Sequence, residues 1–285
     1  MVGDEDQSIY SFRGAYPKAL LQFCEVYPDA QVIKMEQNFR SGRKIVAHAN
    51  RFICQNRQRY EKEMYCETEE EGKIDVYRLP DYAGQYQRIL KIINGIPSGK
   101  TAAVLYRNNE SAIPLIDLFY QSGTPFYNRE HRLSFFHSSV IRDLSAYFIL
   151  ASDLRDREAF SQIAYKLKYS KGVAEYVKEH AGAFGDVFEC ILSLPSLNKS
   201  ARSRTIRYRE KFPKLCRMKP GPAISFVRGE LFYDDYLENR ITGNGMRALA
   251  EQKLNAAICL SEGEKDIFSY MQKLERLSKD IERCV

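Results

Sequence analysis

The spacing of apolar residues changes near residue 135, and this change constrains the fold more than any other feature of the chain. Before it, short runs rich in Val, Ile, Leu and Tyr alternate with segments of helical spacing. After it, apolar residues recur almost wholly at helical spacing, and strand signals are sparse. The sequence therefore predicts an α/β part followed by an all-α part.

Three runs in the first part have the composition of strands and are bounded by polar or glycine-containing turns: residues 31–35, 74–79 and 102–106. Helical segments lie between them, one with Pro17 in its first turn and another with Ser41 as its N-cap. Strands that alternate with helices favour a parallel sheet with crossover connections. We therefore expect a partial parallel sheet with flanking helices.

The second part carries apolar stripes of helical spacing that extend to the C-terminus. The first runs from residue 140 to residue 151. The last consists of Ile267, Met271, Leu274, Leu277 and Ile281. A stripe of this length can meet a partner helix in a coiled coil, but it is more often packed within its own domain.

The composition favours a cytoplasmic protein of two domains. Its 285 residues, 44% of them hydrophobic, suffice for one large core or two modest ones. No uncharged apolar run of about 18 residues is present, and no basic region followed by an apolar one opens the chain, so neither a membrane span nor a secretory signal is indicated. The seven cysteines form no C-x-x-C pair and are typical of free thiols.

Basic residues gather in one segment, although the net charge of the whole chain is only +6. Between Lys199 and Lys219 there are nine lysines and arginines against one acid, Glu210. Such a segment can displace counterions from a nucleic-acid backbone, yet charged runs are more often solvated helix faces. The sequence leaves both interpretations open.

Three patterns partly match a phosphate loop, a calcium loop or a zinc site, but each lacks the required spacing or structural context. Residues 95–101 end like a phosphate loop, but three residues separate the glycines where four are required, and the run leads from a helix into a predicted strand. The acids of residues 4–6 open like a calcium loop, but its glycine and its last glutamate are replaced by Ile9 and Ala15. The four histidines show no zinc-binding spacing. No metal site is therefore predicted.

Two segments of the first part combine residue types suited to phosphate and bases. Residues 2–15 pack acids, an amide, two aromatics and an arginine into one glycine-bounded loop, V-G-D-E-D-Q-S-I-Y-S-F-R-G-A. Residues 35–41, M-E-Q-N-F-R-S, directly follow a predicted strand. An arginine at a strand end can reach the charge that develops on a transferring γ-phosphoryl group, and an aromatic beside it offers a stacking face.

These segments and two others resemble, in order, motifs of the UvrD/Rep/PcrA group of superfamily 1 DNA helicases. The first two resemble V-G-D-x-x-Q-S-I-Y-x-[WF]-R-G-A and L-x-x-N-[YF]-R-S. Residues 102–109 resemble A-V-L-x-R-x-N, and residues 123–147 follow G-x-P-[YF], x-x-F-F and E-[IV]-[KR]-D-x-x-A-Y-L. Each match alone is a weak pattern, but four in order over about 145 residues make an accidental resemblance improbable.

The resemblance implies which residues contact nucleotide and DNA. Gln7 would sense the γ-phosphate, Phe39 would face adenine, and Arg40 would act as the arginine finger. Three residues of the opening loop would contact single-stranded DNA, two by stacking and one in support: Tyr10, Phe12 and Arg13. Taken alone, each residue favours a structural role: core packing for Tyr10 and Phe12, a turn for Gln7, and a helix-terminal salt bridge for Arg40. The ordered matches reverse this preference for Gln7, Tyr10 and Arg40, and only in part for Phe12 and Arg13.

The resemblance also implies the organisation of the chain. Residues 1–37 would be the tail of a first motor domain, residues 38–137 the N-terminal part of a second RecA-like motor domain, and residues 138–285 a helical accessory domain inserted in it. The complete enzyme would be an ATP-dependent 3′-to-5′ DNA helicase that uses ATP and Mg²⁺ and acts on single-stranded DNA and duplex junctions, with no membrane partner.

The chain also departs from the group. No phosphate loop, no D-E-x-[QH] pair for magnesium and no later motor motif occurs between Met1 and Val285. The isolated chain is therefore expected to bind neither ATP nor Mg²⁺ tightly and to be inactive, with the missing motor segments as its partners. An incomplete sheet also predicts an exposed strand edge and apolar surface. The alternative is a non-enzymatic module that binds nucleic acid or a protein through its basic helical half.

Overall fold

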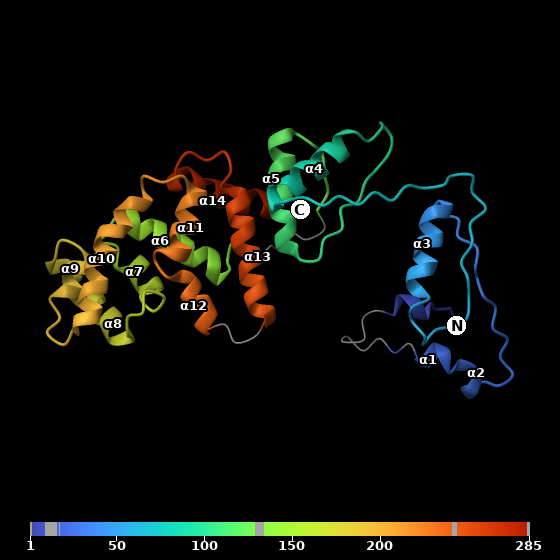
Figure 1. Ribbon diagram of the computed structural model, residues 1–285, viewed down its shortest axis with the longest axis horizontal. Helices are drawn as coiled ribbons and strands as arrows, with labels where there is room; N and C mark the ends of the chain where they lie inside the picture. Colours follow the sequence, from blue (N-terminus) through green and yellow to red (C-terminus); the bar gives the residue numbers. More distant parts are fainter. Residues whose placement is uncertain (1, 9–15, 17, 129–133, 241–243, 284–285) are drawn as a thin grey trace. The chain divides into compact units, whose positions relative to one another are not determined.

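The structure, a computed structural model, describes residues 2–8, 16, 18–128, 134–240 and 244–283 (Figure 1). The chain divides into two compact units, Met1–Arg78 and Leu79–Val285. The described residues of unit 1 include the helical segments η1 (Glu5–Gln7), α1 (Lys18–Leu21), α2 (Phe23–Val26) and α3 (Arg43–Ile53). Of the residues of α3, only Val46 is buried. Polar contacts between segments therefore contribute much of what holds this unit together.

Unit 2 consists of helices joined by turns and extended segments (Figure 1). Before the main bundle come α4 (Tyr82–Asn94), η3 (Asn109–Ala112) and α5 (Ile113–Ser122). The bundle follows with α6 (Ser139–Ser152), α7 (Arg157–Ile163), α8 (Lys171–His180), η4 (Ala181–Ala183), α9 (Val187–Leu192), α10 (Lys199–Leu215), α11 (Pro220–Gly229), α12 (Tyr233–Arg240), α13 (Asn244–Leu260) and α14 (Ile267–Arg283). α6 touches α7, α10, α11, α13 and α14, and it is therefore the central helix of the unit.

Aromatic side chains form much of the core around α6. Tyr147 of α6 is fully buried, and its ring centroid lies 5.9 Å from those of both Phe212 and Tyr233. The apolar stripe of α14 enters the same core, where Ile267 and Leu277 are buried. The C-terminal stripe thus packs within its own unit, as is usual for a stripe of this length. None of the described helices is long and apolar enough to span a membrane.

The prediction of an α/β fold for the first part is wrong. The structure is 59% helix and 1% strand, and no sheet forms among the residues that it describes. The three predicted strands have no regular secondary structure, and Met35, Val76 and Leu105 are 82%, 83% and 93% exposed. A strand requires a neighbouring chain that pairs with its backbone N–H and C=O groups. Composition reports the tendency of a segment to extend, but it does not report whether such a neighbour is present.

One sheet-like contact occurs within the described part of unit 1, and it fixes the segment that precedes Phe39. Gln37 and Tyr65 form an isolated parallel bridge. The Asn38 N–H donates to the Tyr65 carbonyl at 2.8 Å, and the Tyr65 N–H donates to the Glu36 carbonyl at 2.9 Å. Residues 36–38 are therefore anchored to a segment that the apolar pattern did not mark as a strand.

The N-terminus of α3 differs from the prediction, because Gly42 and not Ser41 holds the N-cap position. The Arg43 N–H donates to the Glu70 carbonyl at 3.1 Å, so another segment of the chain closes this helix end. A Cβ atom on Gly42 would lie 2.5 Å from the backbone nitrogen of Gly72. Only glycine permits this close approach of the two backbones. Because the first N–H groups of α3 donate to the carbonyls of Glu70 and Glu71, they are not available to bind an anion.

Candidate functional site

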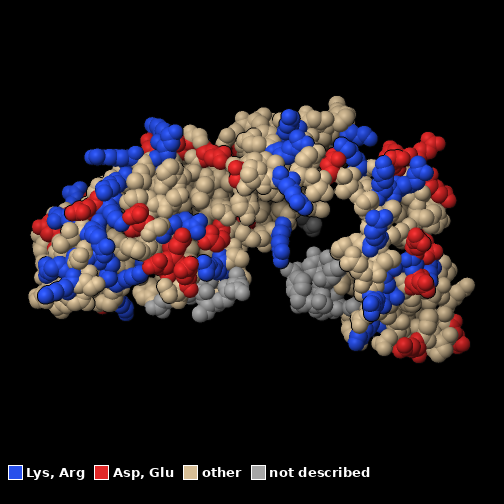
Figure 2. All heavy atoms as spheres, viewed as in Figure 1, with Lys and Arg blue, Asp and Glu red and all other residues tan. Residues whose placement is uncertain are grey.

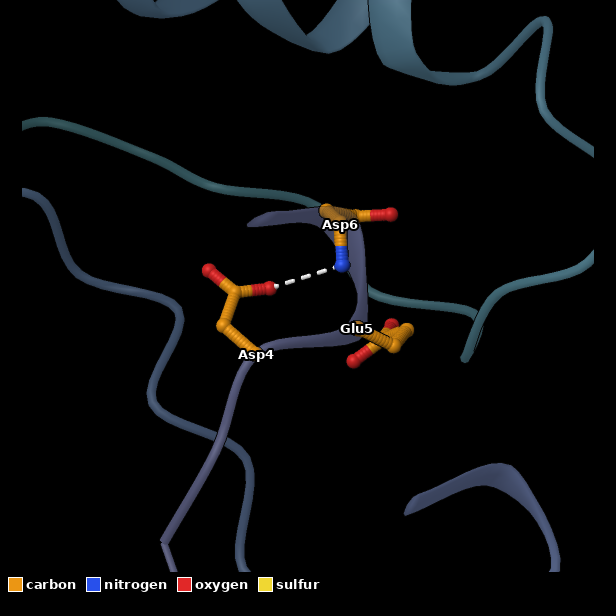
Figure 3. A group of neighbouring side chains, drawn as sticks. All are labelled: Asp4, Glu5 and Asp6. Atoms are coloured by element: carbon orange, nitrogen blue, oxygen red, sulfur yellow. Dashed lines mark hydrogen bonds between the residues drawn. The ribbon is translucent and has the colours of Figure 1, made fainter. Parts of the chain in front are cut away.

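The three acids of the opening loop form one cluster in unit 1. One carboxylate oxygen from each of Asp4, Glu5 and Asp6 lies within 4.8 Å of the others. Figure 3 shows the backbone N–H of Asp6 donating to the Asp4 carboxylate at 3.1 Å. Arg59 donates to Asp6 at 2.8 Å, and the Lys62 ammonium lies 2.8, 3.2 and 3.3 Å from Asp4, Glu5 and Asp6. These two cations balance much of the negative charge of the three acids. The cluster is therefore an ion-pair network that attaches the opening loop to the segment containing Arg59 and Lys62.

Hydrogen bonds within this network shift the pKa values of its members. The hydrogen bond from Arg59 holds the pKa of Asp6 below its ordinary value. Burial alone would raise the pKa of Asp4, but the hydrogen bonds from Lys62 and Gln7 outweigh it and lower that pKa. Burial alone would lower the pKa of Lys62, but its hydrogen bonds to the carboxylates raise it. These contacts therefore favour the charged forms of Asp4, Asp6 and Lys62.

Glu5 connects the opening loop to two further segments of unit 1. Its carboxylate is buried and accepts the Tyr60 N–H at 3.0 Å. The Tyr60 hydroxyl donates to the Leu20 carbonyl of α1 at 2.7 Å. Sequence patterns do not indicate these partners, because Arg59 lies 53 positions from Asp6 and Tyr60 lies 55 positions from Glu5 in the chain. A polar anchor of this kind has no periodicity that could reveal it.

Gln7, the predicted γ-phosphate sensor, lies at the surface of this anchored loop. It is the last residue of η1, and its side-chain amide donates to the Asp4 carboxylate at 2.7 Å. The Gln7 amide oxygen accepts no hydrogen bond from the described residues. The side chain is thus held through its amide nitrogen.

The turn of residues 38–41 presents Phe39 and Arg40 to solvent. The Asn38 side-chain oxygen accepts the N–H groups of Arg40 and Ser41, each at 2.9 Å, and this bonding fixes the turn. Phe39 is 87% exposed, and the exposed Arg40 guanidinium makes no hydrogen bond or ion pair with the described residues. Within that part of the chain, Arg40 is therefore not engaged in a helix-terminal salt bridge.

An exposed aromatic ring, and a guanidinium without a partner among the described residues, are suited on a fixed turn to a ligand that approaches from outside the unit. No hydrogen bond joins Gln7 to Arg40, although both residues belong to unit 1. The predicted DNA contacts Tyr10, Phe12 and Arg13 lie outside the described residues. The roles of all six residues therefore stay predictions.

The third motif match, residues 102–109, leads into an internal brace of unit 2. The Asn108 side chain donates to Gln252 of α13 at 2.8 Å. Two residues later, Glu110 forms an ion pair with Lys253 at 3.1 Å, and each side chain is only 10% exposed. These contacts attach the η3 segment to α13, so Asn108 and Glu110 have structural partners that the motif alone did not indicate.

The fourth match contains a buried carboxylate at the centre of unit 2. Asp143 of α6 is 1% exposed and accepts hydrogen bonds from Gln162 of α7 at 2.9 Å and from the Tyr233 hydroxyl of α12 at 3.0 Å. The Lys166 ammonium lies 3.0 Å from the same carboxylate. Burial raises the pKa of Tyr233, and the nearby Asp143 charge adds to this rise. Asp143 therefore joins three segments of the bundle, a role that the sequence did not reveal.

Comparisons with known proteins agree with the order of these motifs. The UvrD-like helicase C-terminal domain matches residues 33–282, and the UvrD/REP helicase N-terminal domain matches residues 1–28. The putative ATP-dependent DNA helicase YjcD of Bacillus subtilis is 29% identical over 84% of the chain and 32% of its own length. The ATP-dependent DNA helicase PcrA of the same organism is 31% identical over 81% of the chain and 32% of its own length.

A third relative, the ATP-dependent DNA helicase Rep of Salmonella typhimurium, is 33% identical over 62% of the chain and 27% of its own length. The chain thus spans about a third of the length of the curated relatives that it matches.

Proposed function

The chain belongs to the UvrD-like helicases, and from this premise we propose that it works as part of an ATP-dependent 3′-to-5′ DNA helicase. Such an enzyme couples ATP hydrolysis to movement along single-stranded DNA and to the unwinding of duplex DNA. The observation that carries the proposal is the exposed Arg40 on the turn fixed by Asn38, within the matched family domain; its guanidinium has no partner among the described residues.

In the proposed enzyme, Arg40 acts as the arginine finger and Phe39 packs against adenine. The planar guanidinium fork of arginine matches phosphate oxygens and stabilises the charge that develops on the transferring γ-phosphoryl group. The turn supports this role, because two hydrogen bonds to Asn38 hold the backbone while both side chains remain exposed. A fixed backbone reduces the entropy that is lost when the guanidinium engages its ligand.

We propose that the opening loop couples the nucleotide to DNA. Gln7 senses the γ-phosphate, and neighbouring residues of the loop contact the single strand: Tyr10 and Phe12 by stacking, and Arg13 in support. The ion-pair network of Asp4, Glu5 and Asp6 with Arg59 and Lys62 supports this role, because it anchors the loop directly before the coupling residues. Stacking of one base on an aromatic side chain is worth about 1–3 kcal/mol and tolerates any sequence.

In this proposal the chain supplies some of the residues of an ATP site, and other segments of the enzyme supply the rest. Its sequence contains no phosphate loop, and the acids of residues 4–6 are engaged by Arg59 and Lys62, so they do not fit a magnesium site. In the proposed enzyme, other segments hold the β- and γ-phosphates and Mg²⁺, which supplies charge neutralisation during phosphoryl transfer. Residues 1–37, 38–137 and 138–285 then correspond to the tail of the first motor domain, part of the second, and the inserted helical domain.

A chimera tests the proposed function. In it, the present chain replaces the matching segment of Bacillus subtilis PcrA, so that PcrA supplies the phosphate loop and the magnesium ligands. We expect the chimera to hydrolyse ATP and single-stranded DNA to stimulate the hydrolysis, whereas the isolated chain hydrolyses none. A chimera that binds a fluorescent ATP analogue and single-stranded DNA but shows no DNA-stimulated hydrolysis would contradict the proposal.

A further inference from the structure

A small cavity lies in unit 2 where α4 and α5 meet the C-terminal end of α13. Its volume is about 190 Å³, and it is lined by side chains of these three helices and by the turn that follows α13. The cavity lies within one unit, in which α4 packs against α5 and α13 packs against both. Because an apolar cavity of about 150 Å³ holds a benzene molecule, this one has room for one small organic molecule.

The Tyr86 hydroxyl is a buried polar group that lacks a partner at this cavity. Tyr86 of α4 is only 7% exposed, lines the cavity and packs in an apolar cluster with Leu115 and Phe119 of α5. Its hydroxyl makes no hydrogen bond with the described residues. Burial raises the pKa of Tyr86 to about 12, so the neutral phenol can both donate to and accept from a bound molecule. Buried hydroxyls normally have such a partner, and a ligand in the cavity would supply it.

The Cys259 thiol reports the electrostatic potential at the cavity. Cys259 of α13 is half-buried, lines the cavity and packs against the cluster that contains Tyr86. Burial raises the pKa of this thiol to about 11, and the charges of Glu262 and Asp81 add to the rise. Because nearby negative charge disfavours the thiolate, the added rise indicates a negative potential beside Tyr86.

The charge around the cavity is only partly balanced. The Asp117 carboxylate lies 2.8 Å from the Lys273 ammonium and accepts the Gln121 amide at 2.7 Å. The exposed Glu262 carboxylate makes no hydrogen bond or ion pair with the described residues. Among those residues, no lysine or arginine lines the cavity. Figure 2 shows acidic side chains on the surface where α5 lies beside the C-terminal end of α13. The remaining charge is therefore negative and suits a cation.

We propose that this cavity binds a small organic cation that carries its charge on a flat apolar body, such as an aromatic amidine. Pro114 and Leu118 provide apolar lining for the body. Tyr86 and Glu262 both lie near Cys259, so their oxygens can accept hydrogen bonds from one amidinium group. The binding depends neither on ATP nor on DNA, and it can therefore fail or succeed separately from the proposed function.

The test uses the full chain and three probes of the same shape: benzamidine, benzamide and benzoate. Binding is measured by ligand-observed NMR titration. Benzamidine is expected to bind with a Kd of about 1 mM, which is typical of so small a ligand. The neutral benzamide and the anionic benzoate are expected to bind at least about 10-fold more weakly, because hydrogen bonds between charged groups are the stronger ones.

Protection of Cys259 from N-ethylmaleimide shows where benzamidine binds. Mass spectrometry of peptides follows the labelling of each cysteine with time. At a benzamidine concentration about ten times its Kd, mass action predicts labelling of Cys259 that is about 10-fold slower. Cys24 and Cys54 are exposed in unit 1 and serve as internal controls whose labelling rates are expected to stay unchanged.

Three substitutions and one control test the individual contacts. Tyr86→Phe keeps the ring and is expected to weaken benzamidine binding about 3- to 10-fold. Glu262→Gln is expected to weaken the binding of benzamidine but not of benzamide. Its control is Glu158→Gln on α7, at an exposed position whose side chain has no partner among the described residues. Ala83→Leu places a larger side chain in the cavity lining and is expected to abolish binding. Thermal unfolding checks that each variant is folded.

Four results would overturn the inference. The first is the absence of saturable benzamidine binding by the unaltered chain. The second is benzamide that binds as tightly as benzamidine. The third is an equal effect of benzamidine on the labelling of Cys259, Cys24 and Cys54. The fourth is an affinity for benzamidine that Tyr86→Phe and Glu262→Gln change no more than Glu158→Gln does.

Discussion

Replacing Arg40 by alanine in the PcrA chimera is expected to lower kcat for ATP hydrolysis by about 10³-fold or more. An arginine finger acts on the charge of the transition state, so its loss reduces kcat and leaves the binding of ATP nearly unchanged. The exposed Arg40 side chain makes no hydrogen bond or ion pair with the described residues, so the substitution removes no internal contact from that part of the chain. Steady-state hydrolysis at saturating ATP, together with the Kd of a fluorescent ATP analogue, measures both quantities.

Two further variants separate a specific role from a general effect of charge. Arg43, three positions later, is also exposed and its side chain has no partner among the described residues, so Arg43→Ala removes the same charge nearby and is expected to change kcat less than about 3-fold. Arg40→Lys keeps the charge but lacks the planar fork, and it is expected to restore little activity. A loss of only a few-fold in Arg40→Ala, or an equal loss in Arg43→Ala, would remove Arg40 from the ATP site.

Replacing Asp143 by alanine is expected to destabilise the helical unit by about 3–5 kcal/mol, which is typical when one partner of a buried ion pair is removed. The substitution leaves the largely buried Lys166 ammonium without its counterion and the buried Tyr233 hydroxyl without its acceptor. Urea unfolding of the chain, followed by far-UV circular dichroism, measures the change in free energy, because most of the helix lies in unit 2.

Asp153 supplies the matched control for Asp143. It caps the C-terminal end of the same helix, but its carboxylate is half exposed and pairs with an exposed Arg155. Asp153→Ala is therefore expected to cost less than about 1 kcal/mol. If Asp143→Ala were no more destabilising than Asp153→Ala, Asp143 would not be the centre of the α6, α7 and α12 contacts, and its place in the motif would need another explanation.

The helices of unit 2 could be predicted from the sequence, because burial of one helix face imposes its period on the chain. The stripe from Ile267 to Ile281 recurs at intervals of three and four, and it is buried in the structure with Ile267 and Leu277 in the core. Helix ends were less predictable. At α3, Gly42 replaces the expected Ser41 because the position requires close backbone contact with Gly72, and this contact depends on a remote loop.

The predicted sheet failed because pairing is not a local property. Leu105 lies in a run with good strand composition, yet it is 93% exposed, since no neighbouring strand covers it within the described residues. The one bridge instead joins Gln37 to Tyr65, which lies in a polar segment with no strand signal. The network around Glu5 was invisible for a related reason, because Tyr60 is fifty-five positions away in the chain.

The candidate site could be located from the motifs, but the state of its residues could not. The segment around Arg40 was identified by its resemblance to a helicase motif, whereas only the structure shows that its guanidinium forms no salt bridge with the described residues. Asp143 differs from Arg40, because its side chain is buried and has several partners. It lies within the fourth motif match, but only burial and its partners Gln162, Lys166 and Tyr233 reveal a structural role.

The most direct test of coupling between ATP and DNA by this chain is the translocation of the chimera on single strands of increasing length, labelled at either end. We expect the time of arrival at a 5′ label to increase with length, no such arrival at a 3′ label, and loss of movement in Gln7→Ala while DNA binding persists. Arrival at the 3′ label, or a Gln7→Ala chimera that moves as fast as its parent, would contradict the proposed role of the opening loop.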